Sequence, residues 1–239
     1  MWRFSLQRRF FHFSLCLMKK LKNKTGAEQR WLQRQFKDPY VKASHEQNFR
    51  CRSAFKLLEI DDKFRLLKPG SSVVDCGAAP GAWSQVAVQR VNSDGKDPAI
   101  PRGTVVGIDL LNIPALDGAH FLPSHDVTDP VTHAKLQELL PNGRAHIILS
   151  DMAPNASGFK AMDHEKLITM CLSLIDLADK ILQPGGALLC KYWDGFHAHE
   201  LQEKLSRVFS SVQTLKPNAS RKDSSERYLL AKMYRKPAK

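Results

Sequence analysis

Acidic side chains end four strand-like runs of this sequence, and a lysine ends a fifth. Asp75, Asp109, Asp126 and Asp151 each close a short stretch with the character of a strand, and Lys191 closes a later stretch of the same kind. A carboxylate in such a position is costly to bury unless it meets hydrogen-bond donors or cations, so these residues are expected to share a polar pocket. One terminal aspartate could simply cap a helix, but a row of them indicates a site.

A loop rich in glycine and proline follows the first of these runs. The stretch VVDCGAAPGAWSQVAV, residues 73–88, changes from apolar to amphipathic across Gly77, Pro80 and Gly81, as a strand that ends before a helix would do. A dinucleotide-binding loop would instead have the pattern G-x-G-x-x-G, with free glycine amides facing a pyrophosphate. Here Pro80 and Trp83 stand where a phosphate would need amides, and acidic residues surround the loop.

These features favour a cationic ligand that carries adenosine over a dinucleotide. S-adenosylmethionine has this character, because its sulfonium and amino groups are positive. In this interpretation Asp109 accepts hydrogen bonds from the ribose hydroxyls, and Asp126 faces the adenine amino group. NAD stays open as the alternative ligand.

The elements that must position these residues alternate along the chain. The pattern predicts strands at 72–76, 103–110, 120–126, 145–151, 187–193, 211–216 and 227–234. It predicts helices at 48–67, 81–91, 130–140, 163–182 and 197–209, the fourth with Asp163 as its N-cap. Strands rich in Val, Ile and Leu without alternation are buried on both faces, so we expect a Rossmann-like α/β fold with a doubly wound, mostly parallel, seven-stranded sheet. Such sheets bind ligands at the carboxyl ends of their strands.

The composition is that of a folded domain with a polyanionic partner. The chain has 239 residues, of which 43% are hydrophobic, and a net charge of +12 at pH 7. This charge indicates a nucleic acid or an anionic surface as partner, although organellar proteins and their targeting peptides are often basic for other reasons. The cysteines form no C-x-x-C pair and the histidines show no metal-ligand spacing, so neither a disulfide framework nor a metal site is expected.

The first 27 residues contain no Asp or Glu, and basic residues alternate with apolar ones. Such a segment resembles a mitochondrial targeting segment, which leaves residues 28–239 as a single domain with a basic N-terminal extension. The alternative is a disordered basic arm that contacts nucleic acid. No uncharged apolar run approaches the roughly 20 residues of a membrane-spanning helix, so membrane insertion is not expected.

Six stretches of the sequence carry a family resemblance. They are RSAFKLLEI (52–60), DCGAAPGAWSQVA (75–87), GIDL (107–110), LSDMAPNASG (149–158), CKYW (190–193) and SRKDSSERYLLA (220–231). In this order they resemble the FtsJ/RlmE-type ribosomal RNA 2′-O-ribose methyltransferases. The resemblance implies a sheet of the S-adenosylmethionine-dependent methyltransferase type and a catalytic tetrad of Lys56, Asp151, Lys191 and Glu226. It also implies a cofactor site made of Gly77, Pro80, Gly81, Ala82, Trp83, Asp109, Asp126, Val127 and Asp151.

The implied tetrad also suits the reaction chemically. A ribose hydroxyl is a poor nucleophile until its proton begins to leave, so a base must lie within hydrogen-bond reach. A lysine can accept a proton when a second lysine nearby disfavours the charged form, while neighbouring carboxylates hold both in place. Lys191 is the expected proton acceptor, with Lys56, Asp151 and Glu226 around it. Transfer of a methyl group from a sulfonium to an oxygen is an in-line displacement that needs positioning and no metal.

The resemblance and the N-terminal segment together indicate a mitochondrial matrix enzyme that acts on large-subunit rRNA or a pre-ribosomal particle. The family implies a uridine in the peptidyl-transferase-centre loop as the target. Two basic clusters are expected to contact RNA phosphates. The first is Lys19, Lys20, Lys22, Lys24, Arg30, Arg34, Arg50 and Arg52, and the second is Lys216, Arg221, Lys222 and Arg227. Recognition of the 2′-OH would exclude DNA. The alternatives are tRNA or an mRNA cap as substrate, and a non-catalytic ribosome-assembly factor that kept the pocket.

Overall fold

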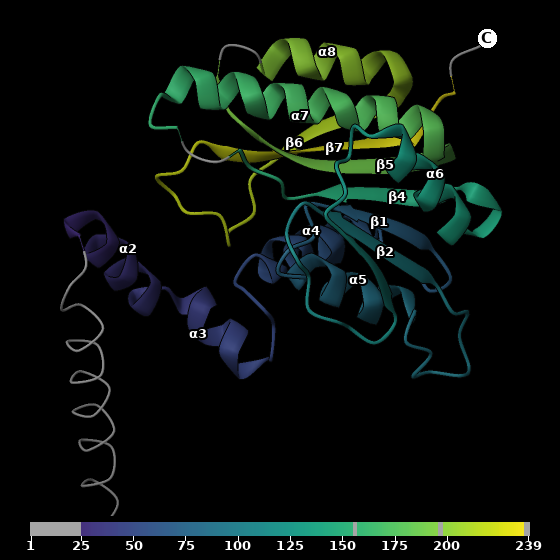
Figure 1. Cartoon of the computed structure of the whole chain (residues 1–239), viewed down its shortest axis with the longest axis horizontal. Coiled ribbons are helices and arrows are strands. Elements are labelled where there is room, and N and C mark those ends of the chain that lie inside the picture. The colour runs from purple at the N-terminus through teal and green to yellow at the C-terminus, as the bar shows by residue number, and fades with distance from the viewer. Residues whose placement is uncertain (1–24, 155–156, 196–197, 237–239) are drawn as a thin grey trace, which may run out of the picture.

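A central sheet organises the chain in a computed structural model, which describes residues 25–154, 157–195 and 198–236 (Figure 1). Its strands are β1 (Ser72–Cys76), β2 (Thr104–Asp109), β3 (Ala119–Pro123), β4 (Ala145–Ser150), β5 (Leu182–Trp193), β6 (Phe209–Leu215) and β7 (Glu226–Tyr234). The strand order is β3-β2-β1-β4-β5-β7-β6, and β7 is antiparallel to both of its neighbours while the other pairs are parallel. This is the doubly wound, mostly parallel sheet that the sequence predicts, so the fold class is confirmed.

Helices cover both faces of the sheet (Figure 1). One face carries α4 (Ala54–Phe64) and α5 (Ala82–Val91), and the other carries α6 (Pro130–Leu139), the short turn η1 (Pro141–Gly143), α7 (Lys160–Ile181) and α8 (Ala198–Val208). Successive strand residues pack on opposite layers: Val73 joins the cluster of α4 and α5, and Val74 joins the cluster of α7. Because both faces are covered, the strands need apolar residues at consecutive positions, which explains the unbroken runs of Val, Ile and Leu.

Two helices that the sequence patterns did not predict precede α4. These are α2 (Gly26–Lys37) and α3 (Pro39–Glu46), which extend to one side of the sheet (Figure 1). Asp38 separates them and caps α3, because its side chain accepts a hydrogen bond from the Tyr40 amide at 3.0 Å and Pro39 occupies the first helical position. Most of the expected targeting segment, residues 1–24, lies outside the described residues. In the described part of the chain, every helix is too short or too polar to cross a membrane.

Two expectations about aspartates are wrong. Asp126 does not end the third strand, because β3 stops at Pro123 and Ser124 then takes a left-handed conformation with φ of 59°. Asp163 does not cap α7, because that helix begins one turn earlier. Asp163 instead accepts hydrogen bonds from the Ser157 amide and hydroxyl, so it stabilises the chain that enters the helix.

The helix that carries Lys56 is shorter than the helix predicted over 48–67. It begins only at Ala54, because the preceding chain is held in an irregular path in which the Arg50 amide donates to the Gln85 side chain at 2.7 Å. It ends before Arg65, which has a left-handed φ of 51°. The shorter helix places Lys56 in its first turn, close to the carboxyl edge of the sheet.

Candidate active site

The register of the sheet places Asp151 beside Lys191. Ser150, the last residue of β4, pairs with Cys190 of β5, so the next residue of each segment reaches the same place. Lys191 Nζ donates a hydrogen bond to the Asp151 backbone oxygen at 2.5 Å and lies 3.1 Å from Asp151 Oδ1. Lys191 lies inside β5 rather than at its end, because that strand continues to Trp193. The two side chains are in direct contact.

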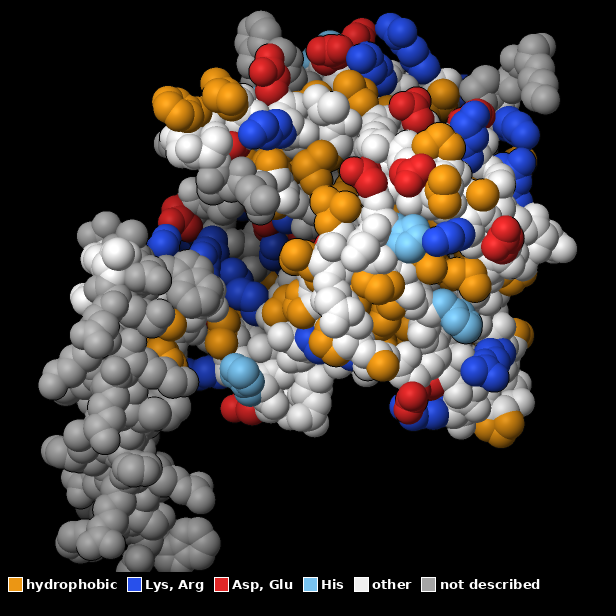
Figure 2. All heavy atoms as spheres, in the orientation of Figure 1, with side chains coloured by type: hydrophobic (Ala, Val, Ile, Leu, Met, Phe, Trp, Pro, Cys, Tyr) orange, Lys and Arg blue, Asp and Glu red, His pale blue; other side chains and the backbone are white. Residues whose placement is uncertain are grey.

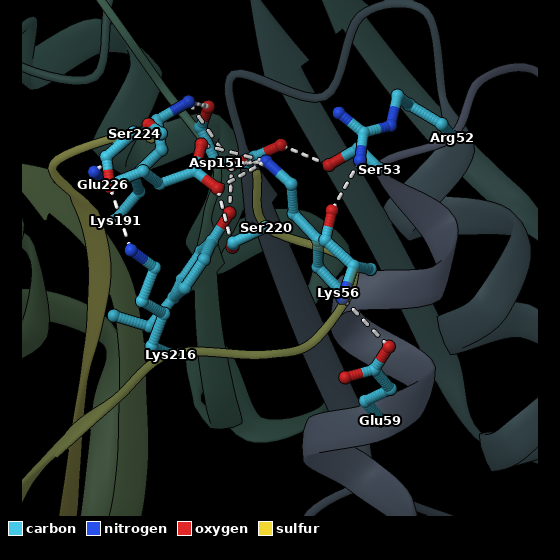
Figure 3. Close-up of polar contacts among 12 residues, drawn as sticks. Arg52, Ser53, Lys56, Glu59, Asp151, Lys191, Lys216, Ser220, Ser224 and Glu226 are labelled. Carbon is cyan, nitrogen blue, oxygen red and sulfur yellow. Dashed lines mark hydrogen bonds and ion pairs between the residues drawn. The ribbon is translucent and has the colours of Figure 1, made fainter. Parts of the chain in front are cut away.

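Lys56 and Glu226 reach the same point from two other elements (Figure 3). Lys56 projects from α4, and Glu226 is the first residue of β7 rather than part of the loop before it. Lys56 Nζ lies 2.8 Å from each carboxylate oxygen of Glu226 and 3.9 Å from Asp151 Oδ1. Ser220 Oγ donates to Glu226 Oε1 at 2.8 Å. The structure therefore brings all four residues of the expected tetrad together.

The Asp151 carboxylate lies at the centre of this cluster. Its Oδ1 accepts a hydrogen bond from the Tyr228 hydroxyl at 2.6 Å, and its Oδ2 accepts one from the Ser53 hydroxyl. Burial raises the pKa of the Asp151 carboxyl, but the ammonium groups of Lys191 and Lys56 and the two hydroxyls outweigh burial and hold that pKa below its ordinary value. Asp151 is thus a fixed negative charge between two cations.

Strand alternation explains why these side chains share one face of the sheet. Lys191 pairs with Tyr228 across β5 and β7, and Trp193 pairs with Glu226. Because side chains two residues apart point the same way, Glu226 and Tyr228 both face α4. Tyr228 belongs to the apolar cluster of α4 and α5, and its ring lies 5.7 Å from Lys56 Nζ. Lys56 therefore meets Glu226 because α4 covers this face.

The four charged groups balance in a nearly dry setting. Lys56 is 7% exposed and Lys191 is 8% exposed. Two ammonium groups with no counter-charge would be costly to bury at such depth, and the carboxylates of Asp151 and Glu226 offset them one for one. In this arrangement a hydroxyl group that arrives at the edge of the sheet meets an amine, a carboxylate and little water.

The glycine-rich loop follows β1 at the same edge. Gly77 has φ of 73° and Gly81 has φ of 104°, a left-handed conformation that favours glycine. A Cβ atom on Gly77 would collide with the Met152 side chain, and one on Gly81 would collide with the Arg50 guanidinium. The backbone conformation therefore favours glycine at both positions, and any larger residue would also force the Met152 or Arg50 side chain to move.

Arg50 is not available for the RNA contact that the sequence suggested. Its guanidinium donates hydrogen bonds to three backbone oxygens, those of Pro80 at 2.9 Å, Pro114 at 2.8 Å and Ala115 at 2.6 Å. Arg50 thereby ties the loop after β1 to the loop after β2. Its contribution to the expected cofactor site is structural.

Asp109 ends β2 and holds the loop from the opposite side. Its Oδ2 accepts from the Ala79 amide at 2.9 Å, and its Oδ1 accepts from the Leu111 amide at 2.8 Å. A carboxylate has about four acceptor sites, so two bonds leave capacity for the hydroxyl groups of a ligand. The expected role of Asp109 toward a ribose stays a prediction.

Asp126 and Val127 lie in the loop beyond β3. Asp126 Oδ1 accepts from the Thr128 amide and hydroxyl, both at 2.8 Å, and these bonds lower the pKa of the Asp126 carboxyl. Val127 is buried in the core cluster of α7. Its backbone oxygen lies 2.7 Å from His133 Nε2. Asp126 is thus exposed and ionised, while the Val127 side chain acts through packing.

Ala82 and Trp83 begin α5 and are both buried. The indole Nε1 of Trp83 donates to the Ser53 backbone oxygen at 2.9 Å and lies 3.1 Å from Ser53 Oγ. The Trp83 ring lies against Tyr228, with 5.7 Å between the ring centroids. Trp83 therefore joins the helix that follows the glycine-rich loop to the residues that hold Asp151.

Ser53 and Tyr228 are members of the site that the sequence reasoning did not select. Both hold Asp151 through their hydroxyl groups. Each lies within one of the quoted stretches, Ser53 three residues before Lys56 and Tyr228 two residues after Glu226. Their short distance in sequence from Lys56 and Glu226 could have identified them, because hydroxyl groups near charged site residues often hold those residues in position.

The described cysteines Cys51, Cys76, Cys171 and Cys190 are free thiols. No group of three or more His, Cys, Asp or Glu side chains in the described ranges is arranged to hold a metal ion.

Asp75 is a further buried carboxyl close to the site. It is 1% exposed, and Ser84 Oγ donates to its Oδ2 at 2.7 Å. Burial raises the pKa of Asp75 to about 7, the Ser84 hydroxyl lowers it in part, and the negative charges of Asp151 and Asp109 raise it further. Between pH 3.8 and about 7, the folded protein therefore keeps a proton on Asp75 that the unfolded chain has lost.

This retained proton predicts how stability changes with pH. Because the pKa of Asp75 is raised on folding, its contribution to the free energy of unfolding falls as pH rises from about 4 to about 7. Asp75→Asn should remove this dependence and keep the bond from Ser84. Urea unfolding at each pH measures the free energy of unfolding of both proteins. As pH rises across this interval, the value for the variant minus the value for the wild type should increase by about 4 kcal/mol. If the free energies of unfolding of the two proteins change in parallel with pH, the raised pKa of Asp75 is contradicted.

Comparison with known proteins decides the family. The family described as "FtsJ-like methyltransferase" matches residues 49–234, which include every residue of the expected tetrad and cofactor site. The chain belongs to this family. The resemblance seen in the sequence is confirmed, and the protein is a methyltransferase.

Similar proteins extend over nearly the whole chain. "rRNA methyltransferase 2, mitochondrial" of Drosophila melanogaster is 42% identical over 215 residues, covering 90% of this chain and 86% of that protein. "Ribosomal RNA large subunit methyltransferase E" of Bradyrhizobium diazoefficiens is 45% identical over 222 residues, covering 90% and 94%. A solved structure of a ribosomal RNA methyltransferase from Plasmodium falciparum aligns with a TM-score of 0.68 and 27% identity, covering 78% of this chain and 98% of that one.

Proposed function

We propose that this methyltransferase transfers a methyl group from S-adenosylmethionine to a ribose 2′-hydroxyl of mitochondrial large-subunit rRNA. The observation that carries the proposal is the contact among two buried lysines and two carboxylates at the edge of the sheet where the glycine-rich loop ends. The target by resemblance is a uridine in the peptidyl-transferase-centre loop. No observation in the described residues favours a tRNA, an mRNA cap or a non-catalytic role.

The residues at this edge fit S-adenosylmethionine. Asp109 has acceptor capacity left for ribose hydroxyls, and the exposed Asp126 carboxylate lies beyond the neighbouring strand. Asp151 offers a negative charge to a positive sulfonium. When bound, the cofactor supplies the methyl group and the leaving sulfide. The donor set therefore suits a cation with hydroxyl groups better than the pyrophosphate of NAD.

The tetrad divides the chemical work in the following way. Lys191 first gives up a proton to solvent, and its neutral amine then accepts the proton of the 2′-hydroxyl as the oxygen bonds to the methyl carbon and the carbon–sulfur bond breaks. Asp151 holds Lys191 in place and faces the cationic centre. Lys56 stabilises the negative charge that develops on the oxygen, and Glu226 holds Lys56 against α4. Because the displacement is in-line, most of the rate comes from this positioning.

The substrate and location rest on the similar proteins and on charge. Curated relatives are named as rRNA methyltransferases, two of them mitochondrial, and the chain carries a net charge of +12. The deciding experiment maps 2′-O-methylation of mitochondrial rRNA in cells that lack the protein, with and without the wild-type chain restored. A large-subunit ribose that loses its methyl group and regains it supports the proposal. An unchanged large-subunit pattern with a lost methyl group on tRNA would refute it.

Asp109→Ala should weaken the binding of S-adenosylmethionine. Removing a charged acceptor for two ribose hydroxyls should cost about 1.5–3 kcal/mol of binding free energy. Isothermal titration calorimetry measures this cost, with urea unfolding to show that the variant folds, since Asp109 also holds the Ala79 and Leu111 amides. Unchanged affinity in a folded variant, or binding of NAD by the wild type, would contradict the cofactor assignment.

Residues 1–27 should direct a fluorescent reporter to mitochondria. Import depends on a basic amphipathic segment without acidic residues, which this stretch provides. A matched control replaces Arg3, Arg8 and Arg9 by Glu and should leave the reporter in the cytosol. A reporter that stays in the cytosol with the unaltered segment would refute the mitochondrial location.

A further inference from the structure

One aromatic ring is exposed to solvent where α7 begins. Phe159 is 69% exposed, and it is the only exposed residue among the Phe, Tyr and Trp side chains that the structure describes. Met162 is 50% exposed and lies three residues later, a spacing that places both side chains on one face. We call these two residues the platform. Figure 2 shows apolar side chains gathered over the start of α7, above the hollow between the N-terminal helices and the body of the protein.

The backbone that presents Phe159 is held by a buried carboxylate. Asp163 is 6% exposed and accepts hydrogen bonds from the Ser157 amide at 3.0 Å and from the Ser157 hydroxyl at 2.6 Å. The Phe159 amide donates to Ser157 Oγ at 3.2 Å, and the Asp163 amide donates to the Phe159 backbone oxygen at 3.0 Å. The Ser157 hydroxyl and amide lower the pKa of the Asp163 carboxyl, so it stays ionised. The ring is therefore fixed in place before any ligand binds, which reduces the entropy that binding costs.

The platform lies beside the strand ends that carry the catalytic cluster. The chain that leaves β4 passes Asp151 and then leads to Phe159 at the start of α7. His164 Nε2 lies 3.0 Å from the Trp193 backbone oxygen, and Trp193 pairs with Glu226 across β5 and β7. His164 is only about 7 Å along the helix from Phe159, at 1.5 Å per residue. The exposed ring is thus next to the edge of the sheet at which the tetrad lies.

The size of the platform suits a nucleotide base better than a protein surface. A base presents one flat π face, which a single ring with a flexible thioether beside it can cover. A stable protein interface buries about 800 Å² on each partner and needs many more side chains than two. The other exposed large apolar side chains of the described residues lie on other segments: Ile100, Leu110, Leu111, Val131 and Met233.

We propose that Phe159 stacks on a base of the RNA strand next to the nucleotide that is methylated. The inference rests on the proposed function and adds a residue that positions its substrate. Lys56 and Lys191 are 7% and 8% exposed, so a ribose reaches them only when its nucleotide leaves the stack of bases. The neighbouring base then loses a stacking partner, and the ring beside the site replaces that partner.

Removal of the ring tests the proposal with a fluorescent base. The probe is a short single-stranded RNA of uridines with one 2-aminopurine, whose fluorescence falls when the base stacks on a ring. The full wild-type chain should quench the probe. Phe159→Ala should lose most of this quenching and bind the RNA about 5- to 150-fold more weakly, the range for one stacked base. A wild type that leaves the fluorescence unchanged would overturn the proposal.

Three further readouts of Phe159→Ala should not change. The slope of log affinity against log salt should be that of the wild type, because no phosphate contact is removed. Affinity for S-adenosylmethionine should be the same. The midpoint of urea unfolding should also be the same, because the ring is exposed in the folded protein. A loss of RNA binding that comes with a lower salt slope or a lower unfolding midpoint would contradict stacking.

Two substitutions at the same position separate stacking from general apolar contact. Phe159→Tyr keeps a ring and should keep both the quenching and the affinity of the wild type. Phe159→Leu keeps apolar surface without a π face and should behave like Phe159→Ala. If leucine restores RNA binding in full, the contact is only apolar and the proposal fails.

Met233→Ala is the matched control. Met233 is 57% exposed and lies near the end of β7 that is far from Glu226, so it is an exposed apolar residue at the opposite edge of the sheet. This variant should quench the probe and bind RNA as the wild type does. Equal losses in Met233→Ala and Phe159→Ala would mean that RNA responds to any loss of exposed apolar surface, which would overturn the platform.

The outcomes separate this inference from the proposed function. A Phe159→Ala protein that binds and quenches the probe like the wild type overturns the stacking contact, whereas a wild type that methylates no rRNA overturns the function. Sedimentation with large-subunit particles is the second measurement. If Phe159→Ala keeps its binding to the RNA probe but no longer sediments with the particles, the ring contacts a protein of the particle and the proposal fails.

Discussion

Lys191→Ala should lower the single-turnover rate of methyl transfer by about 10²–10⁴-fold, the range of a general base. The amine lies at the carboxyl edge of the sheet, 3.1 Å from Asp151, where an incoming hydroxyl must give up its proton. Affinity for S-adenosylmethionine should change little, because an ammonium group has no attractive partner on a cationic sulfonium. The measurement pairs quenched-flow methylation of large-subunit RNA with calorimetric titration of the cofactor.

Lys191→Arg separates the two roles that this lysine could have. Arginine keeps the positive charge beside Asp151 but does not give up its proton at accessible pH, so it can orient and cannot act as a base. The arginine variant should be nearly as slow as the alanine variant. Recovery of the rate by arginine would show an orienting role, and a near-normal rate in Lys191→Ala would move the base to Lys56.

Asp151→Asn should lower both the methylation rate, by at least about 10²-fold, and the affinity for S-adenosylmethionine. The amide oxygen can still accept from one of the hydroxyls of Ser53 and Tyr228, and the other hydroxyl can turn to accept from the amide NH2 group, so the change removes mainly the charge. Without that charge, Lys56 keeps Glu226 as its carboxylate partner, but Lys191 is a buried cation that has lost the carboxylate it contacts, which should also destabilise the fold by about 3–5 kcal/mol. Single-turnover kinetics, cofactor titration and urea unfolding measure the three effects.

Asp61→Asn is the matched control for this variant. Asp61 is also buried and ion-paired, with Arg90 Nε at 3.4 Å, but it lies at the far end of α4 where it accepts from the Leu67 amide. It should lower stability without changing the rate of the folded protein. If both variants lose activity in proportion to stability, the catalytic role of Asp151 is disproved.

Glu226→Ala should have a smaller effect on the rate than either change. Glu226 holds Lys56 from the outer side of the cluster and does not contact Lys191, so it orients more than it reacts. Its position also illustrates a limit of sequence reasoning. The chain places Glu226 at the start of a strand 170 residues after Lys56, and no local pattern joins the two.

The local parts of the site were predictable because local physics determines them. Residues 72–76 and 145–150 are short runs with Val or Ile at consecutive positions, and burial on both faces of a parallel sheet favours such runs. Asp151 follows the second of them directly. Gly77 and Gly81 occupy left-handed positions that other residues rarely adopt, so the loop could be recognised from its letters alone.

The sequence by itself thus determined the order of the seven strands and of the helices from α4 onward, the glycine loop, and the positions of Asp109 at the end of β2 and Asp151 directly after β4. Only the tertiary structure decided that β7 enters antiparallel between β5 and β6 and presents Glu226 and Tyr228 to α4. It also decided that Arg50 closes the loop rather than facing RNA, and that Asp38 joins Arg52 to Arg221. The physical reason is that periodicity records which face of an element is buried, whereas strand order, register and ion pairs depend on how distant elements pack against one another.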